Sequence, residues 1–327
     1  MKTRITELLN IQYPVICGGL FRIGRAPLAA AVSEAGGLGI ITSATFETAK
    51  ELRHEIRKVR ELTDKPIGIN INLFPSVKRM PNEAYIDVLL EEGIRIVETS
   101  GRSPEPYMKV LKDNNVVVIH KVAGVKYAKT AERVGCDAVT VVGFEAGGHP
   151  GMEDVGNIVL VPQTVDALTI PVLAGGGIAD GRGLAAMLAL GAEGIVMGTR
   201  FLASQEALVH DNVKKWMVQA SEGDTALIQK TIGSTSRVAR NAMALQVMDA
   251  ESRGASLEEL LPLISGKKAV RVYNEGDIDA GIFSCGQSVA RIQEIKTVQE
   301  IILGVVNEAK ATVERMGNRW SKVNELK

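Results

Sequence analysis

Short apolar runs and longer amphipathic segments alternate along the first two thirds of the chain. The runs at 116–119 and 139–142 are apolar without alternation, which is typical of strands covered on both faces, as in a parallel sheet. The pattern predicts eight strands, at 15–17, 38–42, 67–73, 94–99, 116–121, 138–142, 172–174 and 194–197. Helical patterns fill the intervals at 27–35, 47–62, 82–91, 105–113, 125–134, 163–168 and 183–190.

Eight strands with interleaved helices predict an α/β fold, a (β/α)8 TIM barrel. A doubly wound open sheet fits less well, because no G-x-G-x-x-G sequence follows the first strand. Beyond Leu202 the pattern predicts only helices between 209 and 253, with further helices at 257–265 and 298–315. We therefore expect a barrel over 1–203, a mostly helical substrate or lid subdomain over 204–290, and a C-terminal helix within 291–320 that packs back on the barrel.

Composition excludes several classes of protein. Apolar residues make up 46% of the 327 residues and charged residues 23%, so the chain can bury a full core. The 38 basic residues balance the 38 acidic ones, which argues against nucleic-acid binding. No apolar run approaches the ~20 residues of a membrane span, and no signal core follows the N-terminus. We expect a cytoplasmic protein without membrane association; a homodimer stays open.

The three cysteines lie far apart, and none forms a C-x-x-C pair. This spacing argues against a structural zinc site or a disulfide framework, and we expect no metal. Cys17 stands at the pocket end of the first strand, where a nucleophile is conceivable. No base is placed by the sequence to activate its thiol, so we interpret it as a small buried residue.

Glycine-rich turns follow the seventh and eighth predicted strands. In a barrel the active site lies at the carboxyl ends of the strands. Two such turns, each leading into a helix, present backbone N–H groups to one point, and this predicts a phosphate site. Tight turning alone would explain either turn taken singly. The candidates are Gly175, Gly176, Gly177, Gly198 and Thr199.

Polar side chains at the same strand ends predict the rest of the site. Lys121 ends a buried strand, where an ammonium needs an anion or a ligand unless it reaches the rim. A positive charge beside the N1–C2 edge of a flavin would stabilise its anionic reduced form. Asn70 offers a donor and an acceptor for the imide edge of the same ring, or else closes a local turn.

His149 is the histidine of a glycine-rich loop, 147–151, after the sixth strand. Its imidazole has the pKa range of an acid or base, although it would otherwise only shape the pocket. We expect His149 and Lys121 to be the catalytic residues. Glu145, just before this loop, is expected to accept hydrogen bonds from backbone N–H groups or a ribityl hydroxyl.

These motifs resemble the nitronate monooxygenase superfamily, whose members are FMN-dependent (β/α)8 barrels. The resemblance covers essentially the whole chain and rests on residues 18–19, 35–39, 70, 145–151, 174–181 and 197–201. The superfamily also holds enoyl-ACP reductase II and an NADH:quinone reductase group. The stretches most similar to the quinone reductases are 73–78, 120–121, 143–145, 149–154 and 235–241. Residues 1–64 look as close to enoyl-ACP reductase II.

The resemblance implies bound FMN, with NADH or NADPH as the electron donor. The residues that it places around the isoalloxazine are Gly18, Gly19, Asn70, Lys121, Gly148 and His149, and Leu20, Glu145 and Gly147 complete the expected FMN site. It implies that Gly176, Gly177, Gly198 and Thr199 hold the phosphate. Pro75, Ser76 and Lys78 would belong to a loop that gates the nicotinamide.

Two departures concern the acceptor. The family commonly has Gln-Gly-Gly-Met after the first strand, where this chain has Cys-Gly-Gly-Leu, and 21–25 replaces an aromatic that the quinone reductases often show. We predict an FMN-dependent oxidoreductase that passes hydride from NAD(P)H to FMN and electrons to a quinone-like acceptor. The alternatives are a nitronate monooxygenase that oxidises alkyl nitronates with O2, enoyl-ACP reductase II, and a flavin-free phosphate-binding isomerase or lyase.

Overall fold

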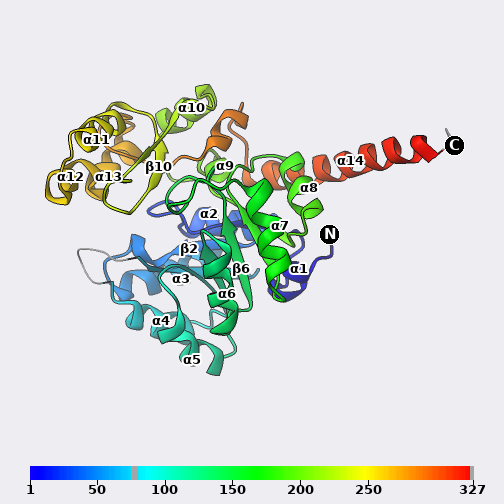
Figure 1. The fold of residues 1–327 in the computed structure, drawn as a ribbon. Coiled ribbons are helices and arrows are strands. Elements are labelled where there is room, and N and C mark those ends of the chain that lie inside the picture. The colour runs from blue at the N-terminus through cyan, green and yellow to red at the C-terminus, as the bar shows by residue number, and fades with distance from the viewer. Residues whose placement is uncertain (75–79, 325–327) are drawn as a thin grey trace.

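Eight parallel strands form one sheet in the order β1-β8-β7-β6-β5-β4-β3-β2 (Figure 1). Leu38 closes the ring, because its carbonyl accepts a hydrogen bond from Cys17 and its N–H donates to Val15, each at 3.0 Å. The predicted (β/α)8 barrel is confirmed. The computed structural model describes residues 1–74 and 80–324, so the expected nicotinamide contacts Pro75, Ser76 and Lys78 lie outside the described residues.

The barrel strands lie close to their predicted positions. They are β1 (Val15–Cys17), β2 (Gly39–Thr42), β3 (Ile67–Leu73), β4 (Ile96–Gly101), β5 (Val117–Val122), β6 (Ala138–Val142), β7 (Val172–Gly175) and β8 (Gly194–Met197). The barrel helices are α1 (Arg4–Leu9), α2 (Ala26–Glu34), α3 (Ala49–Leu62), α4 (Asn82–Glu91), α5 (Glu105–Asp113), α6 (Val125–Arg133), α7 (Asn157–Ala167) and α8 (Gly181–Ala189), and η1 (Ser43–Thr45) follows β2. The sequence placed α7 six residues too late, because the helix contains Pro162 and a proline predicts a helix boundary.

Alternate residues of each strand point into the barrel. The deeper inward positions are apolar, and Ile5 and Leu9 of α1 belong to the same cluster. Two residues nearer the carboxyl ends, the inward positions change character. This ring, which we call the mouth layer, consists of Gly18, Thr42, Asn70, Glu98, Lys121, Thr140 and Gly175. The hydrophobic core of the barrel therefore ends below the mouth layer, and the polar candidate site begins at this layer.

A subdomain follows the barrel. Its elements are α9 (Thr199–Leu202), α10 (Asp211–Gln219), β9 (Thr225–Ile228), β10 (Ser236–Ala239), α11 (Ala242–Ser252), α12 (Leu257–Ile264) and α13 (Gly266–Glu275). The prediction of only helices between 209 and 253 is wrong, because β9 and β10 pair as an antiparallel hairpin. Each strand has four residues, and bridges from Gly148 and Ser284 support β10. A strand this short gains its partners from tertiary structure, so its own sequence carries little signal.

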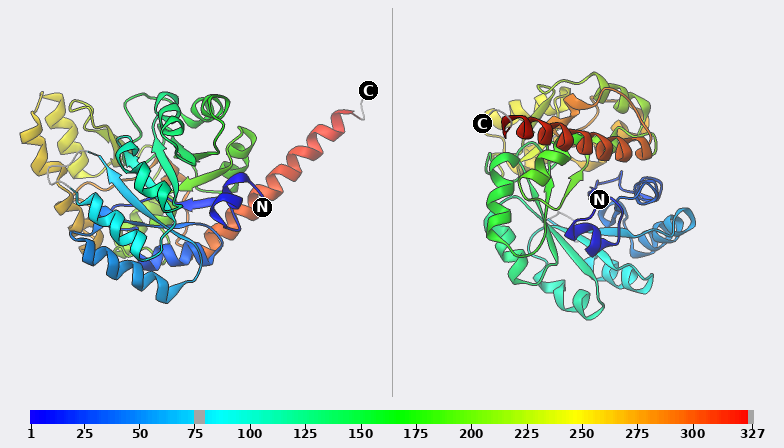
Figure 2. Two further views of the ribbon diagram at one scale, coloured as in Figure 1. Left: turned by 90° about the horizontal axis from the view of Figure 1, so that it is seen from below. Right: turned by 90° about the vertical axis from the view of Figure 1, so that its right-hand side faces the viewer.

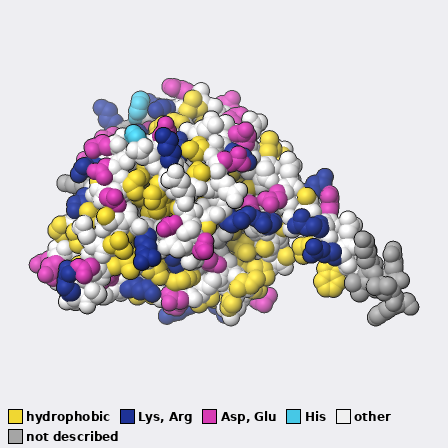
Figure 3. Space-filling view, turned by 90° about the horizontal axis from the view of Figure 1, so that it is seen from above, with side chains coloured by type: hydrophobic (Ala, Val, Ile, Leu, Met, Phe, Trp, Pro, Cys, Tyr) yellow, Lys and Arg dark blue, Asp and Glu magenta, His cyan; other side chains and the backbone are white. Residues whose placement is uncertain are grey.

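The C-terminal helix α14 (Val298–Asn324) begins after the short turn η2 (Gln287–Arg291). Its first half packs on α8 and α2 through buried Val305 and Ala309. Its second half projects from the body (Figure 2) and exposes apolar side chains, including Trp320 at 72%. Among the described residues, no helix is both long and apolar enough to cross a membrane. Basic and acidic side chains are interspersed on the face in Figure 3.

Candidate active site

A buried carboxylate organises the mouth layer. Glu98 on β4 is 1% exposed, and its Oε1 lies 3.3 Å from the Lys121 ammonium. Its Oε2 accepts hydrogen bonds from Asn70 Nδ2 at 2.7 Å and from the backbone N–H of Gly19 at 3.0 Å. A buried carboxylate is costly unless it is paired and hydrogen-bonded, and here both oxygens are engaged. Glu98 therefore fixes Lys121, Asn70 and Gly19 relative to one another.

Sequence reasoning missed Glu98. The anion that Lys121 was expected to meet is supplied in this structure by the chain itself. The Lys121 side chain nevertheless keeps 23% of its surface exposed, so the ammonium can still face a ligand. Glu98 lies within the predicted strand 94–99, and a carboxylate inside a strand buried on both faces was the signal that could have revealed this partner.

Glycines allow the loop after β1 to approach this cluster. A Cβ on Gly19 would lie 2.6 Å from Asn70 Cγ, and one on Gly18 would lie 3.5 Å from the Lys121 Nζ. Only glycine leaves that space open. The Leu20 side chain reaches the start of α9, because a Cβ on Gly198 would lie 3.0 Å from Leu20 Cδ2. Cys17, just before, is buried and burial raises the pKa of its thiol, which confirms its interpretation as a packed residue.

The glycine turn after β7 has free backbone donors. Gly176 and Gly177 have φ of +96° and +73°, a left-handed backbone, and their N–H groups donate to no described residue. Gly175 ends β7 below them. Thr199 opens the four-residue α9, and its Oγ1 accepts a hydrogen bond from Gly286 N at 2.9 Å. Gly176, Gly177 and the start of α9 are the groups that could meet an anion.

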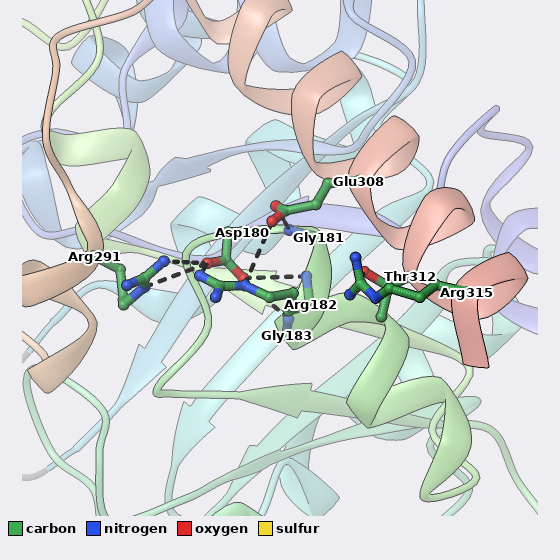
Figure 4. A network of polar contacts seen from close by, with 8 residues as sticks. All are labelled: Asp180, Gly181, Arg182, Gly183, Arg291, Glu308, Thr312 and Arg315. Atoms are coloured by element: carbon green, nitrogen blue, oxygen red, sulfur yellow. Dashed lines mark hydrogen bonds and ion pairs between the residues drawn. The ribbon is translucent and has the colours of Figure 1, made fainter. Parts of the chain in front are cut away.

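The N-terminus of α8, in contrast, is already occupied. Asp180 accepts hydrogen bonds from the N–H groups of Arg182 and Gly183 at 3.1 and 3.2 Å, and Gly181 N donates to Glu308 at 2.8 Å (Figure 4). The expectation that both glycine turns lead into helices with free N–H groups is therefore corrected for α8. An acidic cap satisfies the donors that an anion would use.

The same contacts fasten the C-terminal segments to the barrel. Asp180 forms ion pairs with Arg182 at 2.6 Å and with Arg291 of η2 at 3.2 Å, and Arg182 lies 3.4 Å from Glu308 of α14 (Figure 4). The side chains are partly exposed, so each pair alone contributes little to stability. Together they hold η2 and α14 against the loop that follows the glycine turn after β7.

The loop that carries His149 is anchored by the subdomain. The backbones of Gly148 and Arg237 exchange two hydrogen bonds, at 2.9 and 2.7 Å. The Arg237 guanidinium donates to Phe144 O at 3.1 Å and lies 4.6 Å from the centre of the Phe144 ring. Arg237 is another residue whose part sequence reasoning missed. Its segment, 235–241, was noted only for its similarity to relatives.

His149 stands at the rim of the mouth. Its ring centre lies 4.9 Å from that of Phe74, with 35° between the planes. Its outer edge stays exposed, while crowding by the loop removes water from the ring and lowers the pKa of His149. This desolvation disfavours the protonated form of the imidazole.

One carboxylate oxygen of Glu145 has no hydrogen-bond partner among the described residues. Its Oε1 accepts a hydrogen bond from Asn157 N at 3.1 Å, whereas its buried Oε2 has no partner among the described residues. A Cβ on Gly177 would lie 3.2 Å from Glu145 Cβ, so the two are in contact. Gly147 faces elsewhere: a Cβ there would lie 2.6 Å from Gly286 N, so the returning chain requires this glycine.

His120 lies outside the site. It faces outward from β5, and its Nδ1 lies 2.8 Å from Thr99 Oγ1. Burial lowers the pKa of His120 to about 4, so it is a neutral core residue. Among the described residues, no group of His, Cys, Asp and Glu could hold a metal ion.

Comparisons with known proteins agree on one family. A family model described as nitronate monooxygenase matches residues 2–308. A (3aS,4S,5R,7aS)-5-hydroxy-7a-methyl-1-oxo-octahydro-1H-indene-4-carboxyl-CoA dehydrogenase of Rhodococcus jostii is 34% identical, covering 97% of this chain and 98% of its own. A probable nitronate monooxygenase of Staphylococcus aureus is 34% identical over 73% of this chain and 79% of its own. The structure of FabK from Thermotoga maritima shares 41% identity with a TM-score of 0.90, covering 98% of this chain and 99% of that one. The chain belongs to the nitronate monooxygenase family, whose members are flavin-dependent oxidoreductases.

Proposed function

We propose that this protein is an FMN-dependent oxidoreductase that takes its electrons from NAD(P)H. The observation that carries the proposal is the mouth layer, where an ammonium and an amide are held by one buried carboxylate beside a glycine loop. Such a site suits a flat ring that gains negative charge on reduction. When bound, FMN supplies the two-electron centre between donor and acceptor.

The residues fit this cofactor along its length. Lys121 and Asn70 would face the ring, and the free N–H groups of Gly176 and Gly177 would bind the phosphate. The side-chain carbons of Glu145 contact that turn, and its unpartnered Oε2 would accept a hydrogen bond from a hydroxyl of the ribityl chain.

For the acceptor, we propose an α,β-unsaturated acyl thioester. The dehydrogenase of Rhodococcus jostii is named for a CoA-linked substrate, and residues 1–64 resemble enoyl-ACP reductase II. Reduction of an enoyl thioester adds a hydride at the β-carbon and a proton at the α-carbon, and the donor leaves as NAD(P)+. The imidazole of His149, at the rim, would pass that proton from water to the α-carbon.

The quinone acceptor expected from the sequence is the second candidate. It is favoured by the similarity of 235–241, the segment that anchors the histidine loop through Arg237, to the quinone reductases. A quinone can take its protons from water. The two acceptors therefore differ in their need for His149.

An anaerobic panel on the purified yellow protein tests these proposals. We expect NADH or NADPH to bleach the flavin band and crotonoyl-CoA to restore it. His149→Ala should slow the restoration by crotonoyl-CoA by about 10²–10⁴-fold, the usual loss of an acid–base group, and leave restoration by a benzoquinone unchanged. Bleaching by propyl-2-nitronate but not by NAD(P)H would establish the nitronate monooxygenase alternative. A colourless protein that binds no FMN would overturn the flavin proposal.

A further inference from the structure

A cavity of about 690 Å³ lies between the barrel and the subdomain, apart from the mouth layer. We call it the arginine pocket. Its barrel wall comes from the loops after β1 and β2 and from α3, and its other wall comes from the subdomain. The lining residues are Arg22, Arg25, Thr45, Phe46, Thr48, Lys50, Glu51, His54, Glu55, Leu208, Val270, Tyr273 and Asn274.

Two arginines in this pocket have unmet donors. The Nε atoms of Arg22 and Arg25 are buried, and neither has a hydrogen-bond partner among the described residues. Within that part of the chain, the Arg22 guanidinium also forms no ion pair. Buried donors in proteins are nearly always satisfied, and a guanidinium offers five of them in a planar fork that suits phosphate oxygens. The pocket therefore lacks acceptors that a ligand would supply.

The backbone of Arg22 is strained. Its φ is +67°, an uncommon value for a residue with a Cβ. The surrounding structure holds it there, since Arg22 N donates to Thr45 Oγ1 at 2.9 Å. Its guanidinium lies 5.2 Å from the centre of the Phe21 ring. Such a conformation is found where a side chain must be presented in one direction.

The acidic residues of the pocket are committed to the protein. Glu55 is 3% exposed and accepts hydrogen bonds from Ala26 N at 2.7 Å and from Arg25 Nη2 at 3.4 Å. Glu51 accepts one from Glu47 N at 2.7 Å. Glu55 thus positions Arg25, while Arg22 has no ion-pair partner among the described residues. An aromatic side chain also lines the pocket beside the arginines, since the Arg25 guanidinium lies 5.8 Å from the centre of the Phe46 ring. Cationic forks beside aromatic rings suit a phosphate that carries a flat group.

The pocket lies within reach of the mouth layer. A Cβ on Gly18 would lie 3.5 Å from Lys121 Nζ and 3.6 Å from Glu98 Oε1, and Arg22 follows Gly18 by four residues. Four residues span at most about 14 Å between Cα atoms. A single elongated ligand can therefore have its reactive end at the mouth and its charged end at Arg22.

We propose that the arginine pocket binds the phosphate groups of a nucleotide-linked co-substrate whose reactive end lies at the barrel mouth. The proposal rests on the proposed function for that reactive end. The chemistry is shared by the two nucleotide-linked molecules of the reaction, an acyl-CoA thioester and NAD(P)H, and the experiment separates them.

Steady-state kinetics of Arg22→Asn test the role of the guanidinium. Asparagine tolerates a positive φ, so the turn is retained. If the pocket holds the CoA phosphates, the KM for crotonoyl-CoA should rise at least tenfold, about 1.4 kcal/mol, while the KM for crotonoyl-N-acetylcysteamine and both kcat values stay constant. If it holds the NAD(P)H phosphates, the KM for that donor should rise instead. Arg60→Asn, at an exposed position of α3, is the matched control. Unchanged KM values for both nucleotide-linked molecules would overturn the proposal.

Binding to the FMN-loaded enzyme gives a readout that does not depend on turnover. Adenosine 3′,5′-bisphosphate and 2′,5′-ADP are the probes, measured by calorimetry at two salt concentrations. We expect one of them to bind in a salt-dependent manner and to bind at least tenfold more weakly to Arg22→Asn. Leu208→Trp, which fills the pocket and leaves both arginines intact, should weaken the same probe. Binding of a probe without any thioester reduction would refute the proposed acceptor alone. Thioester reduction without any effect of either substitution would refute the pocket.

Discussion

The barrel mouth has two halves of different construction. Strands β3 to β6 contribute side chains, of which Asn70, Glu98 and Lys121 hold one another. Strand β7 ends in Gly175, and glycines follow β8 and β1, so that there the backbone itself faces the site. We call them the side-chain half and the glycine half. The side-chain half positions a charged group, and the glycine half leaves space for a ligand and presents backbone N–H groups to it.

The difference decides how each half can be damaged. A side chain loses its role when it is truncated or neutralised, and its partners then stand unpaired. A glycine has nothing to remove, so only an added Cβ disturbs it. Substitutions in the glycine half should therefore prevent FMN binding, whereas substitutions in the side-chain half should change the properties of bound FMN.

The largest effect is expected in the glycine half. Gly177→Val adds a Cβ 3.2 Å from Glu145 Cβ at a φ of +73°, so the turn must shift and its N–H groups leave the phosphate position. The variant should purify largely colourless, as measured by the flavin absorbance per protein. Gly93→Val is the control, because Gly93 has a φ of +74° and no atom within 4 Å of the added Cβ. Full FMN occupancy in Gly177→Val would show that this turn does not hold the phosphate.

The next effect belongs to the side-chain half. Lys121→Met removes a charge worth about 4 kcal/mol at a few ångströms and an effective dielectric near 20, before solvent screening. The flavin should stay bound and become harder to reduce, as a lower midpoint potential in potentiometry. The variant also leaves Glu98 buried and unpaired, which commonly destabilises a protein by about 3–5 kcal/mol. Lys121→Met with Glu98→Gln should regain part of that stability and, because the negative charge of the carboxylate is also removed, part of the lost potential. An unchanged potential in both variants would refute the electrostatic role.

A third prediction concerns the outer face of the same half. His120 and Lys121 are neighbours on β5, yet burial holds the outward imidazole neutral, with a pKa of about 4 against 6.5 for the free side chain. The unfolded chain thus binds more protons between those values, so this stability is present above pH 6.5 and is lost as pH falls towards 4. The loss amounts to about 3 kcal/mol. Urea unfolding of His120→Asn should lack this part of the pH dependence, and an identical slope in both proteins would show another group at work.

The smallest effect is expected at the rim between the halves. Transfer of hydride from NADH needs no protein base, so His149→Ala should keep FMN and slow NADH-driven bleaching by less than about tenfold, or ~1.4 kcal/mol in barrier height. Stopped-flow absorbance under anaerobic conditions measures this rate. A slowing of about a thousandfold, with FMN bound, would match the loss of an acid–base group and would show that His149 takes part in the reduction of FMN by NADH.

The sequence by itself determined the barrel and the glycine half. Non-alternating apolar runs mark strands buried on both faces, and glycine at a strand end marks a turn, because both signals are local properties of the chain. The positions of β1, β3, β6 and β8 were predicted to the residue. Lys121 and Asn70 stood out as polar residues near the ends of apolar runs, and His149 stood out as the histidine of a glycine-rich loop.

Only the tertiary structure decided which groups meet. Glu98 and Lys121 are 23 positions apart, and the sequence of neither strand indicates that the two side chains form an ion pair. Gly148 and Ser284 form bridges to β10 of the hairpin. The Asp180 side chain accepts hydrogen bonds from the first N–H groups of α8, so these groups are not available to an anion. Arg22 and Tyr273 share a cavity across the boundary with the subdomain. Hydrogen bonding, desolvation and packing between distant segments depend on distance in space, which a one-dimensional pattern does not contain.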